Sequence, residues 1–130
     1  MYRARDVMSK NVEFVYTDTP IEDALKKLVE KDMTGMPVLD KDKKLAGIVS
    51  EKDMLILLQD PCFGENPVSA YMSSEIVAFE EDDDVIDICD CLMNSKFRRV
   101  PIIDENKKVI GIISRRDIIR FILKVREENQ

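Results

Sequence analysis

The sequence predicts an α/β fold of the α+β type, in which two pseudo-symmetric β-α-β-β-α units pack as one globular domain. The first observation is an internal repeat, because residues 36–58 have a near copy at residues 100–122. Gly47 and Gly111 lie 64 residues apart, and the same offset joins the other matching positions without a gap. The second is the composition of the 130 residues, 45% hydrophobic and 35% charged, which is typical of a globular chain. The third is size, since one copy of roughly 60 residues would have a marginal core and two together would not.

The first copy contains an amphipathic helix, a hairpin and a second helix. The expected elements are a lead-in helix or turn at residues 3–8, a strand at 12–15, a helix from Thr19-Pro20, strands at 36–40 and 45–50, and a helix at 53–58. Thr19 suits the N-cap of the first helix, and Pro20 suits its first turn. Apolar residues recur on one face of this helix, which should cover the core with Ile21, Ala24, Leu25, Leu28 and Val29.

The second copy repeats this order. Its elements are a restart at 68–72, a strand at 76–79, a helix beginning near Val85, strands at 100–103 and 109–113, and a helix at 115–126. The apolar stripe of its first helix consists of Val85, Ile88, Cys89, Leu92 and Met93. Five acidic residues at 80–84 precede this helix, and helix capping explains them better than a cation site. The predicted domains are a first repeat at 1–60, a connector at 61–67 and a second repeat at 68–130.

The composition argues against several classes of function. No histidine is present, which removes Ser-His and Cys-His nucleophile pairs and the usual His/Cys zinc sites. A net charge of −6, spread evenly over both halves, argues against nonspecific nucleic-acid binding. Cys62, Cys89 and Cys91 form no CxxC pair, and the last two are expected to be ordinary helix residues. No apolar run could span a membrane and no signal-peptide core is present, so we expect a cytoplasmic protein.

Both strand-to-helix corners carry a Ser-x-x-Asp motif, Ser50 to Asp53 in the first copy and Ser114 to Asp117 in the second. One interpretation is a capping box, in which the serine hydroxyl and the carboxylate satisfy backbone N–H groups at the helix start. The other is an anion site, because the free N–H groups and the helix dipole at such a corner attract phosphate. A carboxylate one turn further on could then accept both hydroxyls of a ribose. The motif alone leaves both interpretations open.

The two copies differ most in positive charge near these corners. Residues 98–99 are Arg-Arg against Thr-Gly at 34–35, and residues 115–116 are Arg-Arg against Glu-Lys at 51–52. Arginine binds phosphate oxygens through a planar, bidentate fork of donors. The principal phosphate site is therefore predicted on the second copy. The alternative is that these exposed arginines pair with neighbouring carboxylates and contribute about 0–1 kcal/mol each.

The strings GIVSEKD and GIISRRD, preceded by PVLD and PIID and by an amphipathic helix, resemble tandem CBS motifs, a pair of which forms a Bateman module. The resemblance covers residues 5–124. It implies a nucleotide site in the cleft between the repeats, with roles for several residues. These are Asp117 for ribose, Ser114, Arg98, Arg99 and Arg116 for phosphate, Val77 and Phe97 for the base, Thr34 lent by the other repeat, and Pro101 of the PIID segment. The resemblance also implies a second, weaker site formed by Ser50, Lys52 and Asp53, with Met33 and Glu13 flanking the base. Glu13 departs from the small apolar residue usual there, and the first copy lacks the arginine pair.

The predicted function is that of a regulatory, non-catalytic module, standing alone, that binds an adenosine-containing ligand of the AMP, ADP or ATP class and signals to a partner protein in trans. No catalytic cofactor or dedicated metal site is expected, and magnesium would arrive with a triphosphate. The apolar faces of the helices after Asp53 and Asp117 are too broad for one core, which predicts a homodimer through these helices. The alternative function is a ligand-free dimerisation or interaction module, in which the Ser-x-x-Asp corners serve only as caps.

Overall fold

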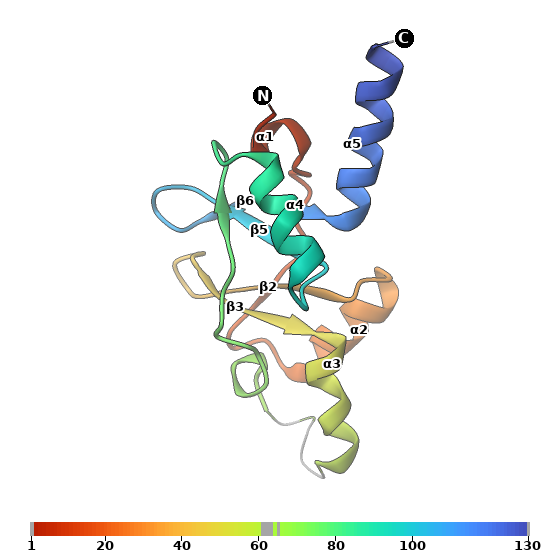
Figure 1. Cartoon of the computed structure of the whole chain (residues 1–130). Helices are drawn as coiled ribbons and strands as arrows, with labels where there is room; N and C mark the ends of the chain where they lie inside the picture. Colours follow the sequence, from red (N-terminus) through yellow and green to blue (C-terminus); the bar gives the residue numbers. More distant parts are fainter. Residues whose placement is uncertain (1, 61–63, 65, 130) are drawn as a thin grey trace. The chain divides into compact units, whose positions relative to one another are not determined.

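The computed structural model describes residues 2–60, 64 and 66–129 (Figure 1). The chain divides into two compact units. Unit 1 contains the residues up to Val12 together with those from Val77 onward, and unit 2 contains Glu13–Ile76. Each unit has its own three-stranded sheet and helices, so the predicted pair of α/β copies is confirmed. Part of the predicted connector, residues 61–63 and 65, lies outside the described residues.

Unit 2 is built on a mixed sheet in the order β1-β2-β3. β1 is parallel to β2, and β2 pairs antiparallel with β3. Every residue of β2 is buried, as expected of a strand that is covered on both faces. The elements of this unit are β1 Val15–Tyr16, α2 Ile21–Glu30, β2 Gly35–Leu39, β3 Leu45–Ser50, α3 Glu51–Met54, and the 3₁₀ segments η1 Leu55–Gln59 and η3 Val68–Ala70.

Unit 1 has the same sheet topology in the order β4-β5-β6, with β4 parallel to β5 and β5 antiparallel to β6. Its core includes Ile88, Val100, Ile102 and Ile113, all fully buried. The Asp84 carboxylate caps the helix after β4 by accepting a hydrogen bond of 2.9 Å from the Ile86 N–H, which confirms capping for the acidic run. The elements are α1 Ala4–Val7, β4 Phe79–Glu80, α4 Val85–Asn94, β5 Arg99–Ile103, β6 Val109–Ser114 and α5 Arg115–Glu128.

The repeat is visible in the hairpin turns. Lys43 and Lys107 both adopt a positive φ, 64° and 65°. Asp40 Oδ1 accepts hydrogen bonds from the backbone N–H groups two and four residues further on, and Asp104 Oδ1 does the same. Such aspartate turns satisfy the backbone without a glycine. Two sequences that differ at many positions therefore form the same hairpin.

A lead-in segment from outside the hairpin region completes each sheet. In unit 1, Ser9 and Ile112 exchange two backbone hydrogen bonds of 2.9 Å each. In unit 2, Ser73 and Ile48 exchange the equivalent pair, at 2.8 and 2.9 Å. The segment that begins the first repeat in sequence therefore packs into unit 1, where α1 contacts α4, α5 and β6 (Figure 1). The segment around Ser73 likewise packs into unit 2.

The start of α2 differs from the prediction. Thr19 was expected as its N-cap, but Pro20 occupies that position without a side-chain hydrogen bond. The Thr19 Oγ1 instead accepts a hydrogen bond of 2.9 Å from the Tyr16 N–H, so it closes the turn after β1. The N-cap prediction for Thr19 is therefore wrong. The hydroxyl serves a backbone donor on the preceding strand, not one in the helix.

Other boundaries also shift. The strands expected at 12–15 and 76–79 are shorter and later, because each forms ladder hydrogen bonds only where it meets its parallel neighbour, at Val15–Tyr16 and Phe79–Glu80. The helix expected at 53–58 is a single α turn followed by the 3₁₀ segment η1. The apolar stripes are confirmed for most positions, but Val29 and Met93, at 81% and 70% exposure, lie on the surface. No helix in the described part of the chain combines the length and apolar character needed to cross a membrane.

Candidate functional site

The corner between β6 and α5 is the centre of the predicted site. Ser114 is the N-cap of α5, and its Oγ accepts a hydrogen bond of 3.1 Å from the Asp117 N–H. The Asp117 Oδ2 accepts from the Ser114 N–H at 2.8 Å and from the Ser114 hydroxyl at 3.0 Å. A complete capping box is therefore present. The other carboxylate oxygen of Asp117 accepts a longer hydrogen bond, 3.4 Å, from the exposed Arg120 side chain.

The arginine pair at 98–99 lies directly beside this corner. Arg99 is the register partner of Ser114 in the β5–β6 ladder, and the Arg115 N–H donates to the Arg98 carbonyl at 3.1 Å. Two predicted groups from segments far apart in sequence are thus brought together within unit 1. Local patterns could not have proved this contact, but the predicted hairpin register is sufficient to produce it.

Arg99 is half-buried, and its Nε is buried without a hydrogen-bond partner in the described part of the chain. Burial lowers the pKa of the Arg99 guanidinium from its usual value, and the nearby Asp117 carboxylate opposes that shift. An unpaired buried donor costs free energy, and a buried cation costs more. An anion placed beside Arg99 would remove both penalties. The corner is thus suited to a phosphate or carboxylate ligand.

The other predicted residues around the corner have different environments. Arg98 and Arg116 are exposed, and neither forms an ion pair within residues 2–60, 64 and 66–129. Phe97 is half-buried beneath the Lys96 ammonium, which lies 5.4 Å from the ring centroid. Val77 packs against the core of unit 1, and Pro101 is fully buried in β5. The two arginines therefore remain accessible to a ligand, whereas Pro101 presents no side-chain surface.

The first-copy corner, in unit 2, is built similarly but with less charge. The Ser50 hydroxyl donates to Asp53 Oδ2 at 2.8 Å and accepts from the Asp53 N–H at 3.4 Å. Lys52 is exposed. The residues opposite the arginine pair are half-buried or buried, and the Thr34 carbonyl accepts a hydrogen bond of 2.9 Å from the Glu51 N–H. Met33 packs, half-buried, against the core of unit 2.

Glu13, which was predicted to flank the base in the weaker site, is engaged by lysines of α2. Its carboxylate lies 3.2 Å from Lys27 Nζ and 3.6 Å from Lys31 Nζ. The hydrogen bond from Lys27 is the main cause that lowers the pKa of Glu13, and the positive charges of both lysines add to it. Lys27 also donates to the Phe14 carbonyl at 2.6 Å. A charged cluster therefore occupies the position where an apolar contact to a base was expected.

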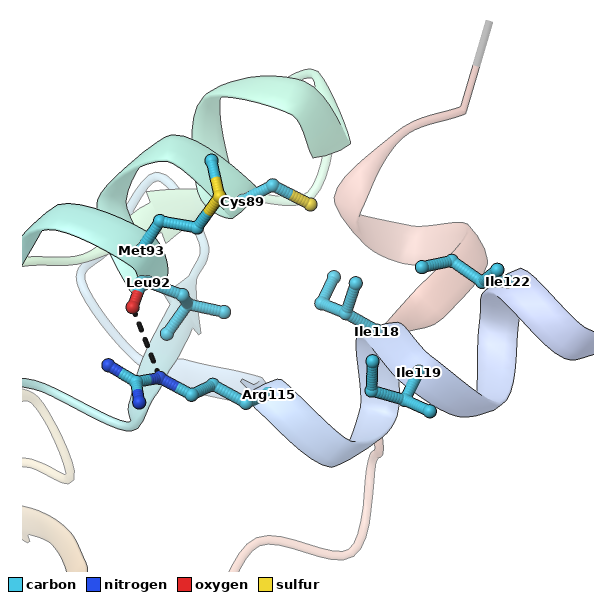
Figure 2. Close-up of a pocket in the computed structure, with 7 residues that line it drawn as sticks. All are labelled: Cys89, Leu92, Met93, Arg115, Ile118, Ile119 and Ile122. Atoms are coloured by element: carbon cyan, nitrogen blue, oxygen red, sulfur yellow. Dashed lines mark hydrogen bonds between the residues drawn. The ribbon is translucent and has the colours of Figure 1, made fainter.

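A second feature of unit 1 is an apolar groove between α4 and α5, with a volume of about 450 Å³ (Figure 2). Arg115 lies at its margin, where its Nε donates to the Leu92 carbonyl at 3.1 Å. Sequence reasoning missed this link, because no local pattern joins residues 23 positions apart. The lining residues are Cys89, Leu92, Met93, Arg115, Ile118, Ile119 and Ile122. Neither Ser114 nor Asp117 is among them, so the groove and the corner are neighbouring but distinct surfaces.

The described cysteines are free thiols. Cys89 and Cys91 are both half-buried on α4, and burial is the main cause that raises the pKa of Cys89. The raised pKa keeps Cys89 protonated and weakly nucleophilic near neutral pH. Cys62 lies outside the described residues. Over the part of the chain that the structure describes, no cluster of three or more His, Cys, Asp or Glu side chains could hold a metal ion.

Comparison with known proteins agrees with the fold and the repeat. The CBS domain family matches residues 4–60 and 68–124, and the chain belongs to this family. An uncharacterized 17.7 kDa protein of Acidianus ambivalens is 30% identical over 123 residues, which cover 95% of this chain and 74% of that protein. The chloroplastic CBS domain-containing protein CBSX2 of Arabidopsis thaliana is 27% identical over 159 residues, covering 99% of this chain and 67% of the relative.

Solved structures of similar proteins have the same architecture. CBSX2 in complex with AMP has a TM-score of 0.87 and 33% identity, with 97% of this chain and 99% of that chain covered. Another crystal structure of the CBS-pair protein CBSX2 from Arabidopsis thaliana has a TM-score of 0.89 and 32% identity, covering 97% of both chains. The chain is thus a tandem CBS pair with the Bateman-module fold.

Proposed function

We propose that this CBS pair is a regulatory, non-catalytic module that binds an adenosine-containing ligand of the AMP, ADP or ATP class at the Ser114 corner of unit 1. The observation that carries this proposal is the buried Arg99 Nε, which lacks a hydrogen-bond partner among the described residues and lies beside a helix N-terminus. A phosphate at this position would accept from the Arg99 fork and interact with the positive end of α5. Ligand binding would therefore relieve a cost that the folded protein otherwise bears.

Separate parts of the ligand would contact separate residues in this proposal. Arg98, Arg99, Arg116 and the Ser114 hydroxyl hold the phosphate, in keeping with the accessibility of the first and third. Asp117 accepts the ribose hydroxyls through the oxygen that now accepts only the 3.4 Å hydrogen bond from Arg120 in the described structure. The base packs on Phe97 and Val77, both half-buried and apolar. A triphosphate would bring magnesium on its own oxygens.

The relative CBSX2 supports the ligand class, because its crystal structure contains AMP and it is similar to this chain over nearly the whole length. The first-copy corner is proposed as the weaker site, since Glu13 is paired with two lysines and no arginine stands opposite Ser50. One nucleotide per chain is the expected stoichiometry. Signalling then passes to a partner protein through the helices that follow the corners.

The proposal is tested by thermal unfolding with AMP, ADP, ATP with and without magnesium, S-adenosylmethionine and NAD. A ligand at about 100 times its dissociation constant stabilises the folded state by roughly 2.7 kcal/mol. For a chain of this size the melting temperature should rise on the order of 10 °C. The variant Asp117→Ala should remove the rise, whereas the matched first-copy variant Asp53→Ala should retain it. Melting temperatures that stay constant with all ligands would refute the proposal.

The second candidate function is a ligand-free interaction module. Two observations favour it: the complete capping box at Ser114, which needs no ligand, and the apolar groove between α4 and α5. Under this function Asp117→Ala causes only the loss of a cap, about 1 kcal/mol, and no ligand response exists to lose. The same thermal unfolding series therefore separates the two candidates.

We also propose a homodimer through the helices after Asp53 and Asp117. Exposed apolar side chains support it, namely Leu55, Ile56 and Leu58 on η1 and Ile119, Ile122 and Leu123 on α5. Clusters of exposed apolar residues are typical of interaction surfaces.

A further inference from the structure

The groove between α4 and α5 has a counterpart at the same repeat positions of unit 2. An offset of 64 residues relates Met93, Ile119 and Ile122 of the groove to Val29, Leu55 and Leu58. In unit 2 these positions lie on α2 and η1, whose buried neighbours Leu28 and Met54 share one core cluster. Apolar character is thus retained at each of these positions in both units. An apolar surface therefore exists on each copy of the repeat.

The two surfaces differ in relief. Ile122 is 46% exposed at the groove of unit 1, whereas its counterpart Leu58 in unit 2 is 96% exposed. Val29 and Leu55 are likewise more exposed than Met93 and Ile119. The cause is local, because α5 continues as a regular helix while α3 gives way to the 3₁₀ segment η1. Unit 1 therefore presents a hollow, and unit 2 presents projecting leucines.

The surfaces also differ in charge at one position. Arg115 at the margin of the groove corresponds to Glu51 in unit 2, each being the first residue of the helix after its corner. Both side chains are exposed, and neither forms an ion pair with any other described residue. The Nε of Arg115 is bound to the Leu92 carbonyl, which fixes the side chain along the groove (Figure 2). Its charge therefore has a fixed position on this surface.

We infer that the groove of unit 1 binds the η1 surface of unit 2 from a second copy of this chain, with Arg115 of one copy against Glu51 of the other. Projecting leucines then enter the hollow, and the one charged pair is of opposite sign. Contact between like surfaces would instead place Arg115 against Arg115 and Glu51 against Glu51, which is repulsive. Unlike charge and unlike relief both favour the contact between unlike surfaces. This inference rests on the proposed homodimer and is independent of nucleotide binding.

The experiment measures dimer dissociation by sedimentation for four forms of the full chain. Glu51→Arg and Arg115→Glu should each raise the dissociation constant at least tenfold, because each places like charges together. The chain carrying both substitutions should return to within about threefold of the natural value, because the pair is restored in reverse. Contact between like surfaces predicts a different result, since neither single substitution then changes the number of like-charge contacts.

Matched controls reverse charge elsewhere on the surface. Asp18→Arg changes net charge as Glu51→Arg does, and Arg126→Glu matches Arg115→Glu, with both positions exposed. These controls should keep the natural dissociation constant, and circular dichroism should show that every form is folded. A natural chain that is monomeric, single reversals without effect, or a double reversal that fails to restore the dimer would each overturn the inference. A nucleotide response that persists in any of these cases leaves the proposed ligand function standing.

Discussion

Arg99 occupies an environment that serves binding at the expense of stability. Its Nε is buried without a hydrogen-bond partner in the described structure, and desolvation lowers the pKa of the guanidinium. Leaving a buried donor unsatisfied costs about 1–3 kcal/mol. Replacing a buried charged group by an apolar one of similar size is often neutral or stabilising. Stability and ligand affinity should therefore respond in different directions at this residue.

We predict that Arg99→Met unfolds at the same or a higher urea concentration than the natural chain, with the free energy of unfolding unchanged or raised by about 1 kcal/mol. The same variant should lose the thermal response to AMP. Arg126→Met is the matched control, because that arginine is exposed on α5 and distant in sequence from the corner. A loss of more than about 2 kcal/mol in Arg99→Met would show that the side chain is mainly structural.

Single residues were predicted best where the repeat fixed their position. The arginine pair and the Ser114 corner come together because the hairpin register is determined by alternating burial, which the sequence displays. Thr19 was misassigned because its hydroxyl had two backbone donors within reach, and the sequence does not rank them. The link from Arg115 to the Leu92 carbonyl depends on how two helices pack, which no local pattern records.

At the scale of the elements, β3 and β6 each carry a glycine where a lead-in segment crosses. A Cβ on Gly111 would lie 2.5 Å from Met8 Sδ and 2.9 Å from Met8 Cγ, both atoms of a flexible side chain. A Cβ on Gly47 would lie 2.7 Å from Met72 Sδ, but also 2.8 Å from the Ser73 carbonyl oxygen. That oxygen accepts the Ile48 N–H and is fixed by the ladder. The two glycines are equivalent in sequence but not in their tolerance to change.

Gly47→Ala should therefore destabilise the protein more than Gly111→Ala. The first requires a backbone shift, with a cost of about 1–3 kcal/mol typical of overpacking. The second requires the methionine side chain to rotate, which its three rotatable bonds allow. Urea unfolding of the two variants at one protein concentration gives the comparison. Equal losses, or a larger loss for Gly111→Ala, would contradict the prediction.

Element types were predicted more reliably than element ends. Both hairpins and both amphipathic helices follow from apolar periodicity, and they occur where that periodicity indicated. The helix after Asp53 was predicted as one element, yet it changes to 3₁₀ geometry at Leu55. Val29 and Met93 fit the apolar stripe and are nonetheless exposed, because the last turn of each helix extends past the core of its own unit. Boundaries of this kind depend on packing partners, which the sequence does not name.

At the scale of the whole molecule, the repeats in sequence and the compact units in space are not the same sets of residues. The repeat marked Met8-Ser9 and Met72-Ser73 as equivalent, but equivalence does not reveal which sheet each segment joins. The backbone bonds of Ser9 and Ile112 place the first segment in unit 1. The fully buried Ala4 and the half-buried Met8 belong with the core of that unit. Unit 1 therefore depends on residues from the opposite end of the chain.

Deletion of residues 1–12 should destabilise unit 1 selectively. The loss uncovers the core around Ala4 and removes both hydrogen bonds to Ile112, so amide exchange in β6 and α4 should accelerate. Amides of β2 and β3 in unit 2 should exchange at rates close to those of the full chain. Hydrogen exchange followed by mass spectrometry resolves the two units. Uniform acceleration in both units, or none in β6, would contradict the prediction.

The origin of the segment around Ser9 also affects the order in which a nascent chain can fold. Ile48 and Ser73 are 25 residues apart, so unit 2 can close while synthesis continues. Ser9 has to wait for Ile112, which leaves the ribosome 103 residues later. During translation the half of the molecule that contains Arg99 is thus the last to mature, and its earliest residues remain without their destination until nearly all the others have emerged.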